Sequence, residues 1–266
     1  MNQDTLRSTP TDAFLKIARK TGFQAVELTM DKVEPIIAKG ALDELGRQIR
    51  TERLKVASIN GPENFNLLSD KEFQSILNRT QNLASAAQQV GCDLLIPVPN
   101  VSKPGLSRLE TISQTAEALR RLADICSNAI NLGLEFLGMR NCSINKLETA
   151  AEVIRQVGRP NVGLVVDSFH MHVSGSPFSE ITKVIEKILL IHVNDSEAGD
   201  LDSLTDSSRI FPGEGTIDLR GFRRVLHDSG YNGYVSLELL KPAYWREDPE
   251  RIARKGRKSL ERTFGI

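Results

Sequence analysis

The 266-residue sequence has no excess of charge of either sign, because 34 lysines and arginines balance 34 aspartates and glutamates. A protein that binds nucleic acid by neutralising phosphates needs a basic surplus, so the balanced charge argues against that class. Cysteine is scarce: Cys92, Cys126 and Cys142 are odd in number and far apart, which fits reduced thiols better than a disulfide framework. No run approaches the roughly 18 apolar residues of a membrane span. Met1–Thr5 has no apolar stretch of the kind that a signal peptide carries. We therefore expect a cytoplasmic protein that binds neither nucleic acid nor membrane.

The chain also lacks low-complexity segments and linkers rich in proline, glycine or serine, so nothing divides it into separate domains. What recurs instead is a short apolar run followed by a longer amphipathic stretch. The runs are Ala25–Thr29, Lys55–Ile59, Leu94–Val98, Gly133–Leu137, Gly163–Asp167, Ile188–Val193 and Tyr234–Leu239. They are too short for core helices, and most are rich in valine, isoleucine and leucine, which predicts buried parallel strands.

The stretches between these runs carry the start and stop signals of helices, namely capping side chains, apolar stripes and terminal glycines. One expected helix runs from an N-cap at Asp70 to Gly91, and a second has an apolar stripe over 112–130 and stops near Gly133. A third expected helix begins after Asp218, and the last begins at Asp248-Pro249.

Strands that alternate with helices predict a parallel sheet. The seven runs and a short first strand within residues 1–5 indicate a (β/α)8 TIM barrel. Barrels of this kind use about 250 residues as one domain, so we expect a single domain over residues 1–266. A doubly wound open sheet is the alternative, but no G-x-G-x-x-G motif follows a predicted strand, which argues against a dinucleotide-binding version.

In such a barrel the active site lies at the carboxyl ends of the strands. Ligand-type side chains stand in or at the ends of four successive predicted strands: Glu135, Asp167, His192 and Glu238. A carboxylate in an apolar strand costs several kcal/mol unless it is paired or bound to a cation. Carboxylates that converge on one barrel mouth would repel each other, and a divalent ion is the simplest compensation. Oxygen donors with one imidazole suit Zn²⁺, Mn²⁺, Co²⁺ or Mg²⁺. For each residue taken alone, the alternative is a salt-bridged structural role.

Other polar residues near the predicted strand ends leave two interpretations open. Glu27 lies in a strand, where a structural and a functional role are equally compatible with the sequence. His170 can reach a substrate oxygen from above the barrel rim, or it is a solvated loop histidine. Arg209 is the basic candidate in a long loop, and its alternative is a solvated loop charge. His172 is a further candidate close to the rim, and His227 is expected on a helix surface.

Three segments give the sequence a recognisable likeness: Val162–His172, Arg209–Leu219 and Val235–Trp245. In these three segments the chain resembles the sugar phosphate isomerase/epimerase superfamily of xylose-isomerase-like TIM barrels, and the likeness extends over nearly the whole chain. Within that superfamily it is most similar to the inosose isomerases of bacterial myo-inositol catabolism. Isomerases, epimerases and dehydratases share these motifs, which are specific for a metal-dependent barrel. Relative to the family the first strand is short, and the segment 138–141 differs from that of the inosose isomerases.

The resemblance implies a function and a set of site residues. The family's metal ligands fall on Glu135, Asp167, His192 and Glu238, with the two glutamates as acid and base. His170 and Arg209 match residues that hold substrate oxygens, and His172 is assigned to substrate binding as well. The implied enzyme of carbohydrate metabolism holds one divalent metal ion and no organic cofactor. It isomerises or epimerises a keto-polyol or ketose by proton transfer through a metal-bound enediolate.

Alternatives to this function stay open at the level of the sequence. A dehydratase of the inosose or 3-dehydroshikimate type would use the same scaffold but expel a hydroxyl group. A DNA-repair endonuclease of the related three-metal type would need more than the four histidines present, and a basic surface. A barrel retained as a non-enzymatic scaffold is disfavoured because the whole ligand set is present. The expected partner of the enzyme is a small sugar or cyclic polyol, and assembly into a homo-oligomer is compatible with the sequence.

Overall fold

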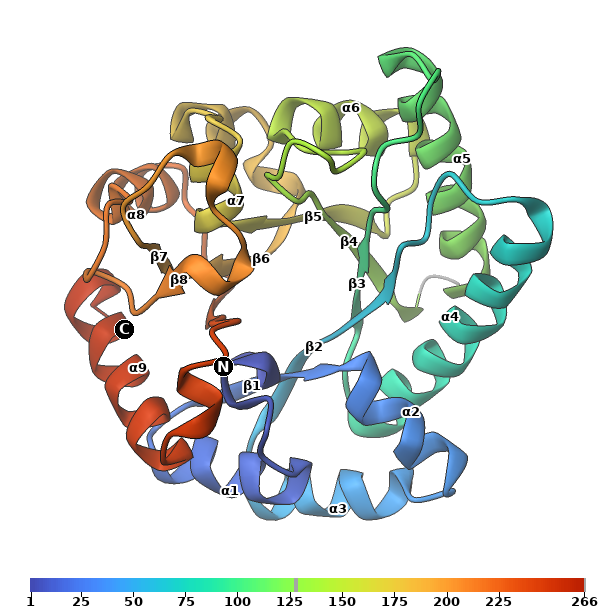
Figure 1. The fold of residues 1–266 in the computed structure, drawn as a ribbon. Helices are drawn as coiled ribbons and strands as arrows, with labels where there is room; N and C mark the ends of the chain where they lie inside the picture. The colour runs from blue at the N-terminus through green and yellow to red at the C-terminus, as the bar shows by residue number, and fades with distance from the viewer. Residues whose placement is uncertain (127–128, 266) are drawn as a thin grey trace.

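Seven parallel strands form a sheet that curls around a central axis, with helices on its outer side (Figure 1). The computed structural model describes residues 1–126 and 129–265. The strands are β1 (Ala25–Thr29), β2 (Lys55–Glu63), β3 (Leu94–Val98), β4 (Asn131–Glu135), β5 (Val162–Asp167), β6 (Ile188–Val193) and β9 (Tyr234–Leu237). They neighbour each other in this order and every pair is parallel, so all of them end at the same rim. The predicted TIM barrel is confirmed, and the open doubly wound alternative is wrong.

The eighth position of the barrel, between β9 and β1, is taken by Met1 and Asn2. Asn2 pairs in parallel with Glu27 of β1, and its backbone N–H donates to the carbonyl of Leu237 in β9 at 2.9 Å. The Glu27 N–H donates in turn to the Met1 carbonyl at 3.0 Å. The short first strand is therefore present, but it does not extend over residues 1–5. Gln3–Leu6 forms a 3-10 helix instead, because the Asn2 side chain caps its first turn.

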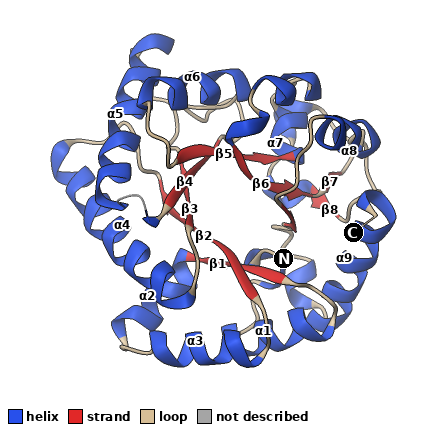
Figure 2. Ribbon diagram, turned by 180° about the vertical axis from the view of Figure 1, so that it is seen from behind, coloured by secondary structure: helices blue, strands red, loops and turns tan. Residues whose placement is uncertain are grey.

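Helices surround the strands in a ring (Figure 2). They are α1 (Thr11–Lys20), α2 (Met30–Ala38), α3 (Leu42–Thr51), α4 (Asp70–Val90), α5 (Arg108–Cys126), α6 (Leu147–Val157), α7 (Ser168–Val173), α8 (Leu219–Asp228) and α9 (Pro249–Phe264). The connection from β6 to α8 holds a short antiparallel hairpin of β7 (Asp195–Ser196) and β8 (Arg209–Ile210). Among the described residues, none of the helices combines the length and the apolar character needed to cross a lipid bilayer.

The helix ends show which of the predicted start and stop signals operate. The Asp218 and Asp248 carboxylates accept backbone N–H groups from the first turns of α8 and α9, as expected. Gly91 closes α4 in the left-handed conformation, with φ at 73°. The N-cap of α4 is Ser69 and not Asp70, because the Ser69 hydroxyl takes part in a capping box with the third residue of the helix.

Gly133 does not stop a helix, contrary to the prediction from the apolar stripe. Within the described residues α5 reaches Cys126, and Gly133 lies inside β4, which begins and ends two residues before the predicted Gly133–Leu137. Residues 127–128 of the predicted stripe lie outside the described part. A Cβ at position 133 would lie 2.8 Å from Val165 Cγ2, so the glycine makes room for a side chain of the neighbouring strand. The sequence alone does not distinguish a packing glycine from a helix stop.

A small apolar cluster forms a layer of the barrel interior just below the rim. Its buried members are Ala25, Ala57, Leu94, Ile96, Val165 and Leu190. Three of them stand two residues before Glu27, Asp167 and His192 on the same strands, and side chains two apart point to the same face of a strand. The carboxylates and the imidazole therefore form the next layer toward the carboxyl rim, above an apolar floor.

Candidate metal centre and active site

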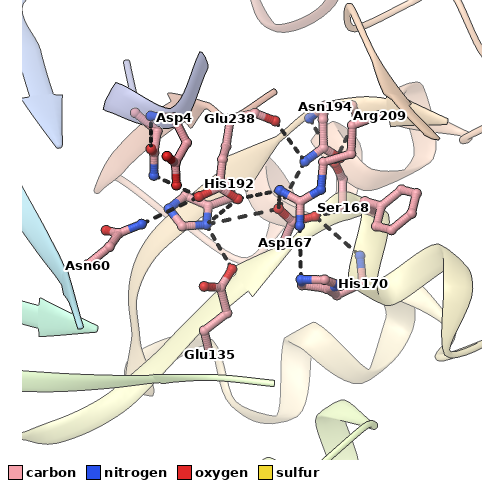
Figure 3. Close-up of polar contacts among 12 residues, drawn as sticks. Asp4, Asn60, Glu135, Asp167, Ser168, His170, His192, Asn194, Arg209 and Glu238 are labelled. Atoms are coloured by element: carbon pink, nitrogen blue, oxygen red, sulfur yellow. Dashed lines mark hydrogen bonds and ion pairs between the residues drawn. The ribbon is translucent and has the colours of Figure 1, made fainter. Parts of the chain in front are cut away.

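The sequence-predicted ligands converge at the carboxyl rim of the barrel (Figure 3). Glu135 and Asp167 are the last residues of β4 and β5, and His192 is the next-to-last residue of β6. Glu238 directly follows β9. One donor atom from each of the four lies within 4.8 Å of the others, and all four residues are buried. Strands that are far apart in the sequence thus present three carboxylates and one imidazole to the same point.

The His192 ring is the centre of this cluster. Its Nδ1 lies 2.8 Å from Glu135 Oε1, 3.3 Å from Glu238 Oε2 and 4.0 Å from Asp167 Oδ2. The other ring nitrogen, Nε2, lies 3.0 Å from Glu27 Oε2. The three predicted carboxylate ligands therefore gather on the Nδ1 side of the ring.

Asp167 is held in place by its second role as the N-cap of α7. Its Oδ1 accepts the backbone N–H groups of Phe169 and His170 at 2.5 and 3.2 Å. Its Oδ2 faces the cluster and accepts a hydrogen bond from the Asn194 amide at 2.9 Å. The cap fixes the orientation of the carboxylate, so a local feature of the helix directs one oxygen at the candidate metal position.

Burial and crowding shift the pKa values of the cluster. Burial raises the pKa of Glu238 well above its ordinary value, and the carboxylates of Glu135 and Asp167 raise it further, against the opposing effect of His192 and Arg209. Burial alone would lower the pKa of His192, but the carboxylates around it, Glu238 foremost, raise it well above its ordinary value. The cluster thus retains protons or takes up a cation to balance its negative charge.

This donor set fits a divalent cation. Three carboxylate oxygens and one imidazole nitrogen are ligands that Zn²⁺, Mn²⁺ and Co²⁺ accept, and carboxylate oxygens also suit Mg²⁺. A doubly charged ion would offset the repulsion between carboxylates that the single charge of Arg209 balances only in part. The apolar floor lowers the local dielectric constant, which strengthens the attraction between the carboxylates and a cation.

Arg209 is buried inside the site, so the interpretation as a solvated loop charge is wrong. It is the first residue of β8, and its Nη1 bonds to Glu238 and lies 3.2 Å from Asp167 Oδ2. Its Nη2 lies 3.0 Å from Asp206 Oδ1 and donates to His170 Nε2 at 2.9 Å. The hairpin of β7 and β8 is what carries the guanidinium into the cluster.

His170 is also buried, on α7, so the interpretation as a solvated histidine is wrong. Arg209 has only N–H groups to offer, so His170 Nε2 accepts and the ring hydrogen resides on Nδ1. Burial, and after it the charge of Arg209, lowers the pKa of His170, which favours this neutral ring. Within the described part of the chain, His170 Nδ1 and Arg209 Nε are buried without a hydrogen-bond partner. Both can donate to oxygens of a bound molecule.

The other two histidines lie outside the cluster. His172 is half-buried on α7, and within the described ranges no hydrogen bond joins it to the cluster residues. Burial lowers the pKa of His172, against the opposing effect of the Asp195 carboxylate. Its assignment to substrate binding stays a prediction without a contact to support it. His227 is exposed on α8, as expected, with Nδ1 at 3.1 Å from Asp228.

Two asparagines that bind the Glu238 carboxylate are not among the site residues predicted from the sequence. Asn2 Nδ2 donates to Glu238 Oε1 at 2.7 Å, and Asn60 Nδ2 donates to the same oxygen at 3.4 Å. Asn60 directly follows the predicted strand end at Ile59, so a search for polar residues at strand ends could have found it. Asn2 lies in a segment that is too short to show a strand pattern.

Glu27, for which the sequence left two roles open, is fully buried against the site. Besides its contact with His192, its carboxylate accepts the Ser58 hydroxyl at 2.6 Å. Burial alone would raise the pKa of Glu27, but the His192 imidazole, helped by the Ser58 hydroxyl, lowers it to about 2. Glu27 Oε2 thus lies directly behind the His192 ring, at 3.0 Å from Nε2.

Residues 15–263 match the family model of the xylose isomerase-like TIM barrels. The chain belongs to this family, which confirms the family resemblance carried by its sequence motifs.

Two named relatives and one solved structure are similar to this chain, and each match covers a different share of it. The inosose isomerase of Bacillus velezensis is 31% identical over 260 residues, which cover 97% of this chain and 93% of that protein. The 3-dehydroshikimate dehydratase of Pseudomonas aeruginosa is 30% identical over 188 residues, which cover 69% of this chain but 29% of that enzyme. A 1.8 Å crystal structure of the IOLI protein with a zinc atom has a TM-score of 0.95 and 28% identity, covering 100% of this chain and 97% of that one.

Proposed function

We propose that the protein is a divalent-metal-dependent isomerase or epimerase that moves a proton beside the carbonyl of a ketose or of a keto-polyol such as an inosose. The observation that carries this proposal is the buried convergence of Glu135, Asp167, His192 and Glu238 on one point of the barrel rim. The match to the inosose isomerase of B. velezensis covers nearly the whole chain, and it supports both the proposed enzyme class and a small sugar-like substrate.

These four residues would hold the ion, with His192 contributing Nδ1, the ring nitrogen that faces the carboxylates. When bound, a divalent ion supplies Lewis-acid polarisation of the substrate carbonyl. The zinc atom in the closely similar IOLI structure supports a metal in a barrel of this shape.

Glu135 and Glu238 are the proton-transfer pair of the proposal. They reach the cluster from β4 and from the end of β9, which are separated in the sheet by β5 and β6. Their carboxylates therefore approach a substrate from different directions. One removes the proton beside the carbonyl, and the other returns a proton to the neighbouring carbon or to the opposite face. Each such transfer by a positioned side chain contributes about 10²–10⁴-fold to the rate.

A cation in the cluster would also prepare Glu238 for its role. Burial raises the pKa of this carboxyl, and a protonated carboxyl cannot act as a base. Positive charge close to a carboxylate favours the ionised form. A bound ion would thereby keep the Glu238 carboxylate ionised and able to accept a proton.

His170 and Arg209 would orient the substrate. Each offers one buried N–H group that has no partner among the described residues, at His170 Nδ1 and Arg209 Nε. A buried donor without an acceptor is unfavourable, so a ligand oxygen at this place would gain a hydrogen bond that the protein leaves unmade. Neighbouring hydroxyl and carbonyl oxygens of a sugar or cyclic polyol fit such a pair of donors.

Proton transfer beside a carbonyl predicts a labelled product. Inososes and ketohexoses incubated in D₂O with the metal-replete enzyme should acquire deuterium at the carbon beside the carbonyl, since the abstracted proton exchanges with solvent before it is returned. NMR of the product measures both the deuterium and the stereochemistry. The same incubation with heat-denatured protein controls for spontaneous enolisation and should leave the substrate unlabelled.

A dehydratase is the second candidate, because the chain also matches the 3-dehydroshikimate dehydratase of P. aeruginosa. That reaction begins with the same proton abstraction but expels a hydroxyl group. Its product would have lost one water and would absorb in the near ultraviolet as an enone or diketone. Loss of water from an inosose, without any deuterated ketone of unchanged skeleton, would contradict the isomerase proposal.

A further inference from the structure

Glu27 contacts the His192 ring at the nitrogen that the candidate metal ligands do not surround. It lies in the middle of β1 and is fully buried. Its Oε2 lies 3.0 Å from His192 Nε2 and accepts the Ser58 hydroxyl at 2.6 Å. Glu27 lies in β1 and His192 in β6, which are far apart in the sequence, so the closure of the barrel places this carboxylate behind the imidazole.

The two nitrogens of the His192 ring face different surroundings. Nδ1 lies among the oxygens of the cluster, with Glu135 Oε1 nearest at 2.8 Å. Nε2 faces one oxygen of Glu27. A neutral imidazole carries one N–H and one lone pair, and only the nitrogen with the lone pair can bind a metal ion.

Glu27 selects between the two forms of this ring. Glu27 Oε2 already accepts the Ser58 hydroxyl at 2.6 Å, so this oxygen is a hydrogen-bond acceptor and stabilises the form of the ring with the hydrogen on Nε2. The opposite form would set the Nε2 lone pair against Glu27 Oε2 at 3.0 Å, which is repulsive. With the hydrogen on Nε2, the lone pair of Nδ1 points at the position that the cluster carboxylates surround.

We propose that Glu27 is a positioning residue for the metal centre: it fixes the orientation of the His192 ring and keeps its hydrogen on Nε2, so that Nδ1 binds the ion. This inference rests on the metal site of the proposed function. A carboxylate behind a ligating imidazole also makes the ring a stronger ligand, and the loss of such a partner typically weakens metal binding about 10–100-fold.

Glu27→Gln tests this role, because it preserves the size of the side chain and removes its charge. Its amide can turn an N–H₂ group toward His192 and so favour the wrong form of the ring. We expect the Zn²⁺ dissociation constant, measured by competition with a chromophoric chelator, to rise about 10–100-fold. Glu63→Gln is the matched control, since Glu63 ends β2 at an exposed position, and it should bind Zn²⁺ as the unchanged protein does.

Thermal unfolding of the metal-free proteins separates positioning from a purely structural role. A structural role alone would lower the Tm of Glu27→Gln and leave its Zn²⁺ dissociation constant unchanged, which would overturn the inference. If the unchanged protein bound no Zn²⁺, the proposed metal site itself would be contradicted. Tight binding by both proteins would overturn only the role of Glu27.

A spectroscopic measurement on the unchanged protein keeps the inference testable if Glu27→Gln does not fold. The protein is loaded with an NMR-active cadmium isotope, and its histidines carry labelled nitrogen. We expect the cadmium-coupled histidine nitrogen to be Nδ1, with the hydrogen on Nε2 of the same ring. Coupling of cadmium to Nε2 would overturn the inference.

Discussion

Glu238→Gln should abolish nearly all turnover while the barrel stays folded. The substitution preserves the shape of the side chain but removes the charge with which it accepts a proton and binds a cation. Loss of the proton transfer alone lowers kcat by about 10²–10⁴-fold. The measurement is kcat on the best inosose or ketose substrate at saturating metal, with circular dichroism to verify the fold.

A moderate loss of stability should accompany this loss of activity. Asn2 and Arg209 both donate hydrogen bonds to the Glu238 carboxylate, one to each oxygen. The amide of glutamine can accept from one of them only, so its N–H₂ group must face a donor, which costs about 1–3 kcal/mol for a buried group. Glu63→Gln serves again as the control and should retain both activity and Tm. Normal kcat and metal content in Glu238→Gln would assign the proton transfer to another residue.

Asp167→Asn should release the metal without unfolding the short helix behind it. Asparagine is as good an N-cap as aspartate, so its side-chain oxygen can still accept the N–H groups of Phe169 and His170. Its N–H₂ group, however, takes the place of Oδ2, the oxygen that faces the cluster. We expect the Zn²⁺ affinity to fall by more than the 10–100-fold that is typical for the loss of an outer partner. Chelator competition measures this change.

Asp218→Asn is the matched control for Asp167→Asn. Asp218 is also an aspartate N-cap, at the start of α8, and lies at the surface away from the cluster. The control should bind Zn²⁺ normally, because it changes the same chemical group in the same helix position without touching the site. If both variants lost the metal equally, the effect would come from helix capping, and Asp167 would not be a ligand.

The candidate ligands could be predicted from the sequence because their signal is local. Glu135, Asp167, His192 and Glu238 each stand in or at the end of an apolar run, and parallel strands in a barrel bring their carboxyl ends together. No contact between them had to be known in advance.

The surroundings of these ligands depend on contacts between distant segments, and the sequence could not supply them. Glu27 contacts a histidine that is 165 positions away, so its sequence neighbours carry no sign of its role. Arg209 lies in a connection without regular periodicity, and only the hairpin of β7 and β8 shows that it turns inward. Ser69 and Asp70 are both good capping residues, and the choice between them depends on a hydrogen-bond geometry that a pattern does not contain.

A crystal structure of the zinc-replete protein, grown without chelator and with the ion located by anomalous scattering, tests the metal centre most directly. We expect one ion bound by carboxylate oxygens of Glu135, Asp167 and Glu238 and by Nδ1 of His192, at about 2.0–2.3 Å from each. An ion bound elsewhere, or these four side chains pointing apart, would contradict it.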